Sequence, residues 1–429
     1  MNQKQKILFV LPFNPYPLST GGSQAIFNGI DVVKDDLDVY VTFEATATDK
    51  DNIERLKSLL DNKVTVLPYF VPAPKSTKRD LKQRFYEPLF KTEKKLRRLA
   101  GYDFTPVRIP HRAWLHEELL PKKLAFVKHV SNIVDEYNID IVQCEMLCNV
   151  TMGLMLPDRV RKVFVHHELG WVVHELELQT QKGDAFEQKL YLDYYKMCEV
   201  ALLNTYDEVI TLSSIDTEKL LKAGVKARMH TSLAVVNTPQ DAMLSTNRWN
   251  VLSFVGPDCN LPNVSGIKWF LANVWGQLIK KDSSYRLQII GHWSPEHIAE
   301  VISGYENVEY LGFVEDLPSV LKDTIMIVPI TVGSGIRMKI LEASAMGVPF
   351  VTTSVGVEGI PVENGVHCLV ADTPEEFCEA ILRLQVDETR RHLAINANRL
   401  VKEKYSLEAL KNNRATIYND TTLSLPEKS

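Results

Sequence analysis

The stretch GSGIRMKILEASAMGVP, residues 333–349, decides the fold of this chain. It follows an apolar run at 325–330 that is typical of a buried strand, and its own apolar residues recur at helical spacing. A strand, a glycine loop and a helix start form an anion cradle, because backbone N–H groups and the positive end of the helix dipole meet there. We predict that this stretch binds the phosphates of a ligand. The alternative is a plain glycine turn before a solvated, charged helix face.

Length and composition limit the class of protein. A chain of 429 residues exceeds the usual size of a single core, so we expect two domains. The net charge of −5 argues against a nucleic-acid-binding protein, so we expect no nucleic-acid partner. The six cysteines have no paired C-x-x-C spacing, which favours free thiols over a metal site. The N-terminal apolar run is too short for a signal peptide, and no run approaches the ~18 apolar residues that span a bilayer. We therefore expect a cytoplasmic protein.

Short apolar strands alternate with helices along most of the chain, which is typical of parallel sheets. This pattern starts at Ile7, becomes less regular over 225–250, and restarts at Val251. Two helical stretches, 374–384 and 393–418, form the tail. The sequence thus predicts two α/β domains, each with a parallel sheet.

Each predicted domain has a glycine loop after one of its strands. Gly21 and Gly22 end the first loop, and Gly333 to Gly335 open the second. Open parallel sheets bind ligands beyond the carboxyl ends of their strands. We therefore expect both loops to line a cleft between the domains.

At these residues the chain resembles the GT-B glycosyltransferases, and most closely glycosyltransferase family 4. The segment PYPLSTGG (15–22) is similar to that family's first loop, and VLSFVG (251–256) is similar to the start of its donor domain. Residues 333–349, with SVGVEG (354–359), are similar to its donor-binding core. The resemblance implies the GT-B architecture, an α/β fold of two Rossmann-like domains that face an interdomain cleft.

The resemblance also implies a role for each part of the chain. Residues 1–225 would form an acceptor-binding domain and residues 245–400 a domain that binds the nucleotide sugar. A C-terminal helix within 401–429 would pack back on the first domain. The implied activity is that of a retaining, hexosyltransferase-type glycosyltransferase in cell-surface glycan synthesis. Its partners would be a nucleotide-sugar donor and a glycan or lipid-linked acceptor.

No metal and no cofactor are implied, because backbone amides and basic side chains hold the diphosphate in this fold, and the nucleotide sugar is itself a substrate. Two alternatives remain open. One is a nucleotide-sugar epimerase of GT-B fold, and the other is a non-catalytic relative that binds a nucleotide sugar.

The donor site carries one match and two departures. Glu342 matches the second glutamate of the family's E-x7-E motif, which implies a clamp on the ribose hydroxyls. Ser334 stands where the first glutamate is expected, which leaves the donor sugar and the role of that position open. The basic residues that usually follow the first donor-domain strand are absent, with Asn263 near the expected lysine. We therefore hypothesise that Arg337 and Lys339 supply the positive charge.

Besides Gly21 and Gly22 of the first loop, three glycines and an isoleucine are predicted to bind substrate, because glycines let a ligand approach the backbone. The residues expected at the donor site are Gly256, Gly333, Gly335 and Ile336. Ser334 lies between two of them.

Four further side chains are candidates at the cleft. His167 ends a strand where the family carries a histidine near the reacting sugar, and His166 is the second choice. Glu145 follows another strand, although a buried or capping carboxylate is an equal alternative. Glu358 lies in the turn after a later strand. It could contact the donor ribose or base, and a plain surface role is an equal alternative.

The segment 75–98 contains ten Lys or Arg residues and three Asp or Glu, interleaved with aromatic and apolar residues. Such a segment can rest on anionic lipid, at ~1 kcal/mol per basic residue near the surface. It therefore predicts peripheral contact with the inner face of the membrane. A solvated helix or loop is the alternative.

Overall fold

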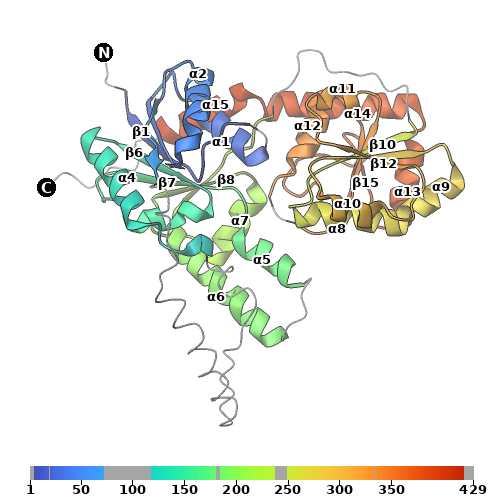
Figure 1. Ribbon diagram of the computed structural model, residues 1–429, viewed down its shortest axis with the longest axis horizontal. Coiled ribbons are helices and arrows are strands. Elements are labelled where there is room, and N and C mark those ends of the chain that lie inside the picture. Colours follow the sequence, from blue (N-terminus) through green and yellow to red (C-terminus); the bar gives the residue numbers. More distant parts are fainter. Residues whose placement is uncertain are drawn as a thin grey trace, which may run out of the picture.

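The computed structural model describes residues 4–18, 20–71, 117–179, 184–236, 249–333 and 335–419. Two parallel sheets, each covered by helices on both faces, form two domains that lie side by side (Figure 1). Among the described residues, no helix has both the length and the apolar character that crossing a bilayer requires.

The N-terminal domain is built on a seven-stranded sheet of order β4-β2-β1-β6-β7-β8-β9, and all its strand pairs are parallel. Every residue of the two central strands β6 and β7 is buried, as expected for a parallel sheet with both faces covered. The strands are β1 (Lys6–Val10), β2 (Asp38–Thr42), β4 (Thr65–Val66), β6 (Ile141–Glu145), β7 (Arg161–His166), β8 (Glu208–Thr211) and β9 (Arg228–Thr231). A separate pair joins β3 (Glu44–Ala45) to β5 (Tyr69–Phe70).

Helices connect these strands, and their ends carry the expected capping residues. Ser213 caps α7 by accepting a hydrogen bond from the Asp216 amide, and Gly224 ends that helix with a φ of 101°. Thr20 caps α1 in a capping box with Ser23. The helices described in this domain are α1 (Gly21–Asp31), α2 (Lys50–Leu59), α4 (Leu124–Glu136), α5 (Gly170–Gln179), α6 (Ala185–Leu203) and α7 (Ser214–Ala223), with the short η1 (Ala47–Asp49), η2 (Glu117–Leu119) and η3 (Leu147–Leu154).

The C-terminal domain is built on a six-stranded parallel sheet of order β12-β11-β10-β13-β14-β15. Its strands are β10 (Val251–Val255), β11 (Arg286–Ile290), β12 (Val308–Gly312), β13 (Ile325–Val328), β14 (Phe350–Thr352) and β15 (Leu369–Val370). Its helices are α8 (Leu261–Phe270), η4 (Leu271–Trp275), α9 (Gly276–Lys281), α10 (Pro295–Ile302), α11 (Leu317–Leu321), α12 (Met338–Met346), α13 (Pro374–Arg383) and α14 (Asp387–Lys404).

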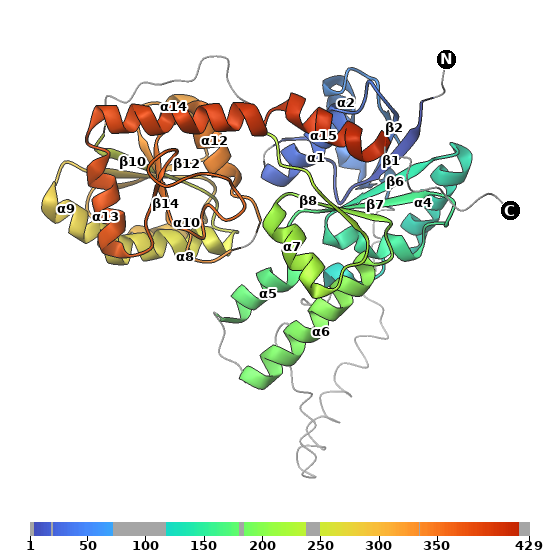
Figure 2. The same ribbon diagram turned by 180° about the vertical axis from the view of Figure 1, so that it is seen from behind.

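The chain passes between the domains twice, and the two passages touch. The first follows β9, and the second joins α14 to the last helix, α15 (Leu407–Asn419). The amide of Val236 in the first passage donates a 3.1 Å hydrogen bond to the carbonyl of Tyr405 in the second. Figure 2 shows α14 along the C-terminal domain and α15 along the N-terminal domain.

Helix α15 belongs structurally to the N-terminal domain, although it ends the described chain. Leu410 and Ile417 join the hydrophobic core that covers one face of the seven-stranded sheet. The buried guanidinium of Arg161 in β7 donates to the carbonyls of Ile417 at 2.7 Å and of Tyr418 at 3.0 Å. A cation at the last carbonyls of a helix is favoured by the helix dipole, so Arg161 fixes the end of α15 against the sheet.

Candidate active site

The carboxyl ends of both sheets face each other where the two domains meet, and this junction is called the cleft below. A Cβ atom added to Gly335, after β13, would lie 3.4 Å from the carbonyl oxygen of His167, after β7. One added to Gly21 at the start of α1 would lie only 2.8 Å from Cγ of Met338 at the start of α12, which is closer than a side chain tolerates. Both glycine loops named from the sequence therefore lie where the two domains meet.

The loop that precedes α12 is shaped by two glycines with positive φ. Gly333 has a φ of 147° and Gly335 a φ of 75°, conformations that other residues rarely adopt. Arg337 occupies the N-cap position of α12, and its NH1 group donates a 2.5 Å hydrogen bond to the carbonyl of Gly335. Ile336 packs against the cores of both domains. Ser334 lies outside the described residues.

Arg337 is not a solvated helix charge. Only 9% of the residue is exposed, and this burial lowers the pKa of its guanidinium. The carboxylates of Glu358, Asp216 and Glu168 oppose this effect and favour the charged guanidinium. Asp216 and Glu168 belong to the opposite domain. The cation thus lies at the interdomain surface, where it can meet an anionic ligand.

Lys339 follows Met338 in the first turn of α12, and its side chain reaches Asn263 near the start of α8. Its Nζ donates a 2.5 Å hydrogen bond to Oδ1 of Asn263 and lies 5.0 Å from the centre of the Phe254 ring. Burial, reinforced by the charge of Arg337, lowers the pKa of Lys339 to about 7. The amine therefore changes charge near neutral pH, and a nearby phosphate would restore its positive charge.

Asn263 connects that amine to the loop after β10. Its Nδ2 donates a 3.0 Å hydrogen bond to the carbonyl of Pro257, and a Cβ atom on Gly256 would collide with the amide, 2.5 Å from Nδ2. The amine of Lys339 thus lies beside Asn263, near the position where the resemblance leads one to expect a lysine. Glu342 lies one turn further along α12, and burial raises the pKa of its carboxyl group.

On the opposite side of the cleft, His167 is bonded to Glu145. The His167 Nε2 and the Glu145 Oε2 are 2.7 Å apart, and the other carboxylate oxygen accepts a 2.6 Å hydrogen bond from the Gln143 amide. Glu145 is the last residue of β6 and is buried. The histidine side chain is 11% exposed and follows β7. Glu145 therefore orients this histidine.

His166 has a different environment. Its side chain is 1% exposed, and its Nε2 lies 2.7 Å from Oε1 of Glu199 in α6. Glu199 also accepts hydrogen bonds from the amides of Gly170 and Trp171, at 3.3 and 3.2 Å. This cluster joins β7, α5 and α6 inside the N-terminal domain, so the contacts of His166 are those of a structural residue.

Glu358 bridges the domains. Its carboxylate lies 2.8 Å from Nζ of Lys219 in α7, and both side chains are about one-third exposed. The neighbouring Gly359 touches Ser213, since an added Cβ would lie 2.9 Å from the serine Cβ. Glu358 thus has an ion-pair partner across the cleft, which the sequence did not indicate.

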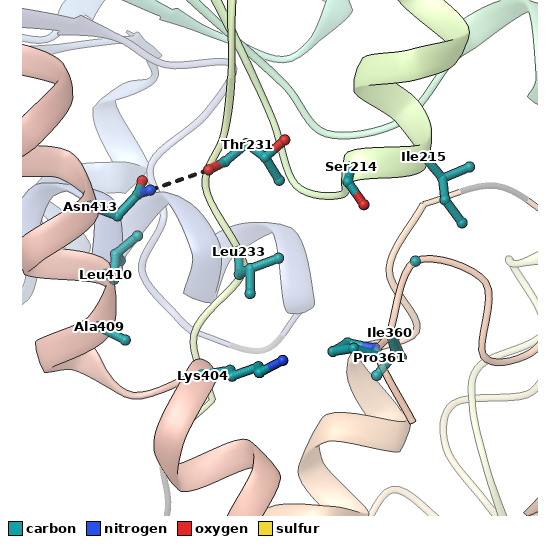
Figure 3. A pocket seen from close by; sticks show the side chains of 11 residues that line it. Ser214, Ile215, Thr231, Leu233, Ile360, Pro361, Lys404, Ala409, Leu410 and Asn413 are labelled. Carbon is teal, nitrogen blue, oxygen red and sulfur yellow. Dashed lines mark hydrogen bonds between the residues drawn. The ribbon is translucent and has the colours of Figure 1, made fainter. Parts of the chain in front are cut away.

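A cavity of about 530 Å³ lies beside this bridge, at the passages between the domains. Figure 3 shows Ser214 at the start of α7, Lys404 at the end of α14 and Asn413 on α15 around it. The Asn413 amide donates a 3.2 Å hydrogen bond to the Thr231 carbonyl. Of the predicted donor-site residues that the structure describes, none lines this cavity.

Sequence reasoning missed three side chains that hold the predicted site residues in place. Gln143, Glu199 and Lys219 each bond a residue that the sequence had singled out. Gln143 carries a weak signal, because a polar residue inside an otherwise apolar buried strand usually has a partner. Nothing in the order of residues pairs Glu199 with His166, or Lys219 with Glu358. Within the described ranges, no three His, Cys, Asp or Glu side chains gather as a metal site.

Comparison with known proteins identifies the later half of the chain. Residues 250–387 match the protein family described as "Glycosyl transferases group 1". The match covers most of the C-terminal domain, which is therefore similar to a group 1 glycosyltransferase domain. The glycine loop and α12, with Arg337, Lys339 and Glu342, lie inside the matched residues. The resemblance first suggested by residues 333–349 is confirmed.

Solved structures confirm the GT-B fold of the whole chain. A sucrose-phosphate synthase from Thermosynechococcus elongatus is similar with a TM-score of 0.66 and 17% identity, covering 97% of this chain and 98% of the other. HepE from Anabaena, crystallised in complex with UDP, is similar with a TM-score of 0.64 and 14% identity, covering 96% and 99%.

One sequence relative extends beyond the glycosyltransferase domain. An uncharacterised 44.6 kDa protein in the cps region of Klebsiella pneumoniae is 24% identical over 315 residues. The match covers 70% of this chain and 76% of that protein.

Proposed function

We propose that this protein is a retaining glycosyltransferase that transfers a hexose from a nucleotide-sugar donor to a saccharide or lipid-linked acceptor of the cell surface. The observation that carries the proposal is the facing of two groups across the cleft. Arg337, Lys339 and Glu342 lie on one side, and the His167–Glu145 pair lies on the other. The N-terminal domain binds the acceptor and the C-terminal domain binds the donor.

Each donor-site group has a task that its chemistry fits. The guanidinium of Arg337 and the amine of Lys339 neutralise the diphosphate, assisted by the backbone amides of the glycine loop. The carboxylate of Glu342 accepts hydrogen bonds from the ribose hydroxyls, in charge-assisted bonds of about 1.5–3 kcal/mol. Gly256 and Gly333 to Gly335 let the ligand approach the backbone. No metal ion or cofactor is needed, because side chains of this chain supply the positive charge.

The reaction then needs positioning and charge stabilisation more than a protein base. Negative charge develops on the leaving diphosphate, where the two buried cations stabilise it in the transition state. The leaving phosphate oxygen takes the acceptor proton, so the acceptor attacks the face that the diphosphate leaves. His167 forms a hydrogen bond with a hydroxyl of the donor sugar and holds the sugar in position for this attack. Retention of the anomeric configuration follows from this geometry.

The comparisons support this class of substrate. HepE was crystallised with UDP and also with UDP-glucose, which makes uridine diphosphate sugars the first donors to test. The Klebsiella relative lies in a cps region, which supports a role in surface polysaccharide synthesis.

A thermal-shift screen against UDP-, GDP-, ADP- and dTDP-sugars tests the donor site. A ligand at ~100 times its dissociation constant adds ~2.7 kcal/mol to the free energy of unfolding. We expect one base to raise Tm clearly above the others. The matching Arg337→Ala variant should lose that rise. If no nucleotide sugar shifts Tm in the wild-type protein, the proposal is wrong.

Product analysis with and without acceptor then separates the alternatives. A transferase forms a glycoside only when an acceptor is present, and NMR of the product gives its anomeric configuration. An epimerase converts the donor without an acceptor. Tight nucleotide binding with neither product would favour the non-catalytic relative, for which Ser334 in place of the expected glutamate is the specific reason.

We also propose that the N-terminal domain rests on the cytoplasmic face of a membrane. The basic segment 75–98 lies outside the described residues. Among those described, Phe186, Leu190, Tyr194 and Met197 form an exposed apolar stripe along one face of α6. Co-sedimentation with anionic vesicles should fall in the double variant Phe186→Ser/Leu190→Ser and persist in Val386→Ser, an exposed apolar control in the other domain. Equal sedimentation of all three proteins would contradict membrane contact through α6.

A further inference from the structure

The start of α1 in the N-terminal domain touches the start of α12 in the C-terminal domain. Gly21 is the first residue of α1, and Met338 is the first residue of α12. A Cβ atom added to Gly21 would lie 2.8 Å from Cγ and 3.4 Å from Cβ of Met338, and the first of these distances is shorter than side chains tolerate. The two helices therefore meet at a point that has no room for a side chain on Gly21.

The backbone conformation of Gly21 does not call for a glycine. Unlike Gly333 and Gly335, it has no positive φ, and it belongs to a regular helix that Thr20 caps. Alanine adopts this conformation freely and favours a helix over glycine. The reason for the missing side chain is therefore steric, and the residue that occupies the space is Met338.

Met338 cannot easily move away from Gly21. Its side chain packs against the core of the C-terminal domain, and Cγ lies so near the main chain that rotations about the outer bonds of the side chain do not move it. The neighbouring Gly22 differs, because it faces Cε at the flexible end of Met146. Of these two contacts, the one between Gly21 and Met338 is therefore the rigid one, and it joins the two domains.

This contact lies beside the cations of the candidate active site. Arg337 precedes Met338, and Lys339 follows it. Gly335, two residues before Arg337, also lies against the N-terminal domain, since a Cβ atom added there would lie 3.4 Å from the carbonyl oxygen of His167. The N-terminal domain thus contacts the chain just before and just after Arg337.

We propose that Met338 is a positioning residue that seats on Gly21 of the opposite domain and so fixes where the two cations at the start of α12 lie relative to His167. In this interpretation Gly21 lacks a side chain in order to receive Met338, and not to let a substrate approach its backbone. Because the two domains contribute different groups to the reaction, a misplacement of ~1 Å at their contact can cost ~100-fold in rate. The effect on rate rests on the proposed function, but the contact itself does not.

Alanine variants test the inference, and α1 supplies its own control. Gly21→Ala adds the methyl group that collides with Met338, and Met338→Ala makes room for it. Gly29→Ala adds the same group to the same helix at a place where, among the described residues, no atom beyond its own stretch of helix lies within 4 Å of the added Cβ. The rate of UDP release from UDP-glucose gives kcat, and calorimetry gives the affinity for UDP.

We expect Gly21→Ala to lower kcat by about tenfold or more and to leave the affinity for UDP unchanged, whereas Gly29→Ala should behave as the wild-type protein. In the Met338→Ala background, Gly21→Ala should cause no further loss, because the trimmed side chain leaves room for the methyl group. An equal loss of kcat in both backgrounds, or a loss of UDP affinity that Met338→Ala does not restore, would assign Gly21 to the ligand and overturn the inference. Unchanged kcat in Gly21→Ala would overturn it as well.

A cysteine pair tests the contact without any turnover and covers the case in which Gly21→Ala does not fold. The Cβ separation of 3.4 Å is close to the ~3.5–4.5 Å that disulfides span. The double variant Gly21→Cys/Met338→Cys should form a disulfide under mild oxidation, seen as a shift in gel mobility that a reductant reverses. Each single variant should show no such shift, which excludes pairing with the six native cysteines.

The cross-link also separates this inference from the proposed function. No cross-link in the folded double variant would overturn the inference. A cross-link in the double variant, together with a wild-type protein that turns over no nucleotide sugar, would support the contact and contradict the proposed function instead.

Discussion

The two sides of the cleft neutralise charge in different ways. On the N-terminal side, the histidines at the end of β7 have carboxylate partners within the same domain, Glu145 for His167 and Glu199 for His166. On the C-terminal side, the amine of Lys339 bonds an amide oxygen, and Arg337 donates to a backbone carbonyl. Burial lowers the pKa of both of these cations. The histidines on the N-terminal side thus have partners without any ligand, whereas an anionic ligand would stabilise the charged forms of Arg337 and Lys339 on the C-terminal side.

This difference teaches how each side contributes to binding. Groups that are paired inside one domain are held in place before any ligand arrives, so their removal should affect folding and orientation. Burial destabilises the charged forms of Arg337 and Lys339, although nearby carboxylates partly favour both charges, and an anionic ligand reverses that destabilisation. Their removal should affect ligand binding first.

The largest expected effect is on stability. Glu199→Ala removes a carboxylate that accepts three hydrogen bonds inside the N-terminal domain, so we expect the free energy of unfolding to fall by about 3–5 kcal/mol. Urea denaturation measures it. Glu218→Ala removes an exposed carboxylate of α7 that pairs with Lys222, and should leave stability nearly unchanged because solvent screens such a pair. Similar losses in both variants would contradict the structural role assigned to Glu199.

The next largest effect is on nucleotide affinity. Arg337→Ala should weaken binding of the nucleoside diphosphate by about 10- to 150-fold, since charge-assisted bonds contribute ~1.5–3 kcal/mol. Calorimetry with the diphosphate and with its nucleoside separates the phosphate contribution, because the nucleoside should bind both proteins equally. Arg391→Ala, at a half-exposed arginine of α14, is the matched control. Unchanged affinity in both Arg337→Ala and Lys339→Ala would exclude these residues as the diphosphate site.

A smaller effect should mark the ribose clamp. Glu342→Gln keeps the shape of the side chain but weakens its bonds to the ribose hydroxyls, so we expect about a tenfold loss of affinity. The variant should also discriminate less between ribose and 2′-deoxyribose forms of the same nucleotide. Competition binding with the two forms measures this ratio. An unchanged preference for ribose would place the clamp elsewhere.

The smallest effect is a dependence of affinity on pH. Burial lowers the pKa of Lys339 to about 7, and a bound diphosphate raises it again. Below pH 7 the amine is charged with or without ligand, so affinity stays constant. Above pH 7 binding takes up a proton, so affinity should fall several-fold per pH unit, with tenfold as the limit. Lys339→Met should bind more weakly and lose this slope, whereas a slope that persists would assign the titration to another group.

Local pattern predicted the parts of this structure that depend on periodicity. The alternation of apolar strands with helices indicated both parallel sheets, and the glycines at 333 and 335 indicated the loop that precedes α12. The tail was predicted as a helical stretch over 393–418 with a final helix within 401–429, and the structure divides it into α14 and α15 near Tyr405. That division has a tertiary cause, because the Tyr405 carbonyl accepts the Val236 amide of the other passage between the domains.

The contacts that define the site were less accessible to sequence reasoning. Lys339 was named as a cation, but its contact with Asn263 depends on how β10 and β13 lie side by side in the sheet. From the sequence, Tyr418 is expected to be one of the apolar residues of the amphipathic tail. Only the packing of α15 on the N-terminal domain brings its hydroxyl to Gln143. Such long-range pairs leave no mark in the local order of residues.

The crossing of α15 has a practical consequence for engineering. Because this helix completes the core of the N-terminal domain, exchanging the C-terminal domain as everything after residue 250 would remove part of the N-terminal domain as well. A chimera should instead be joined at the two touching passages, near Val236 and Tyr405, so that the recipient keeps its own last helix. The C-terminal domain can then be exchanged as an internal cassette, with α1 and α15 left together on the N-terminal domain.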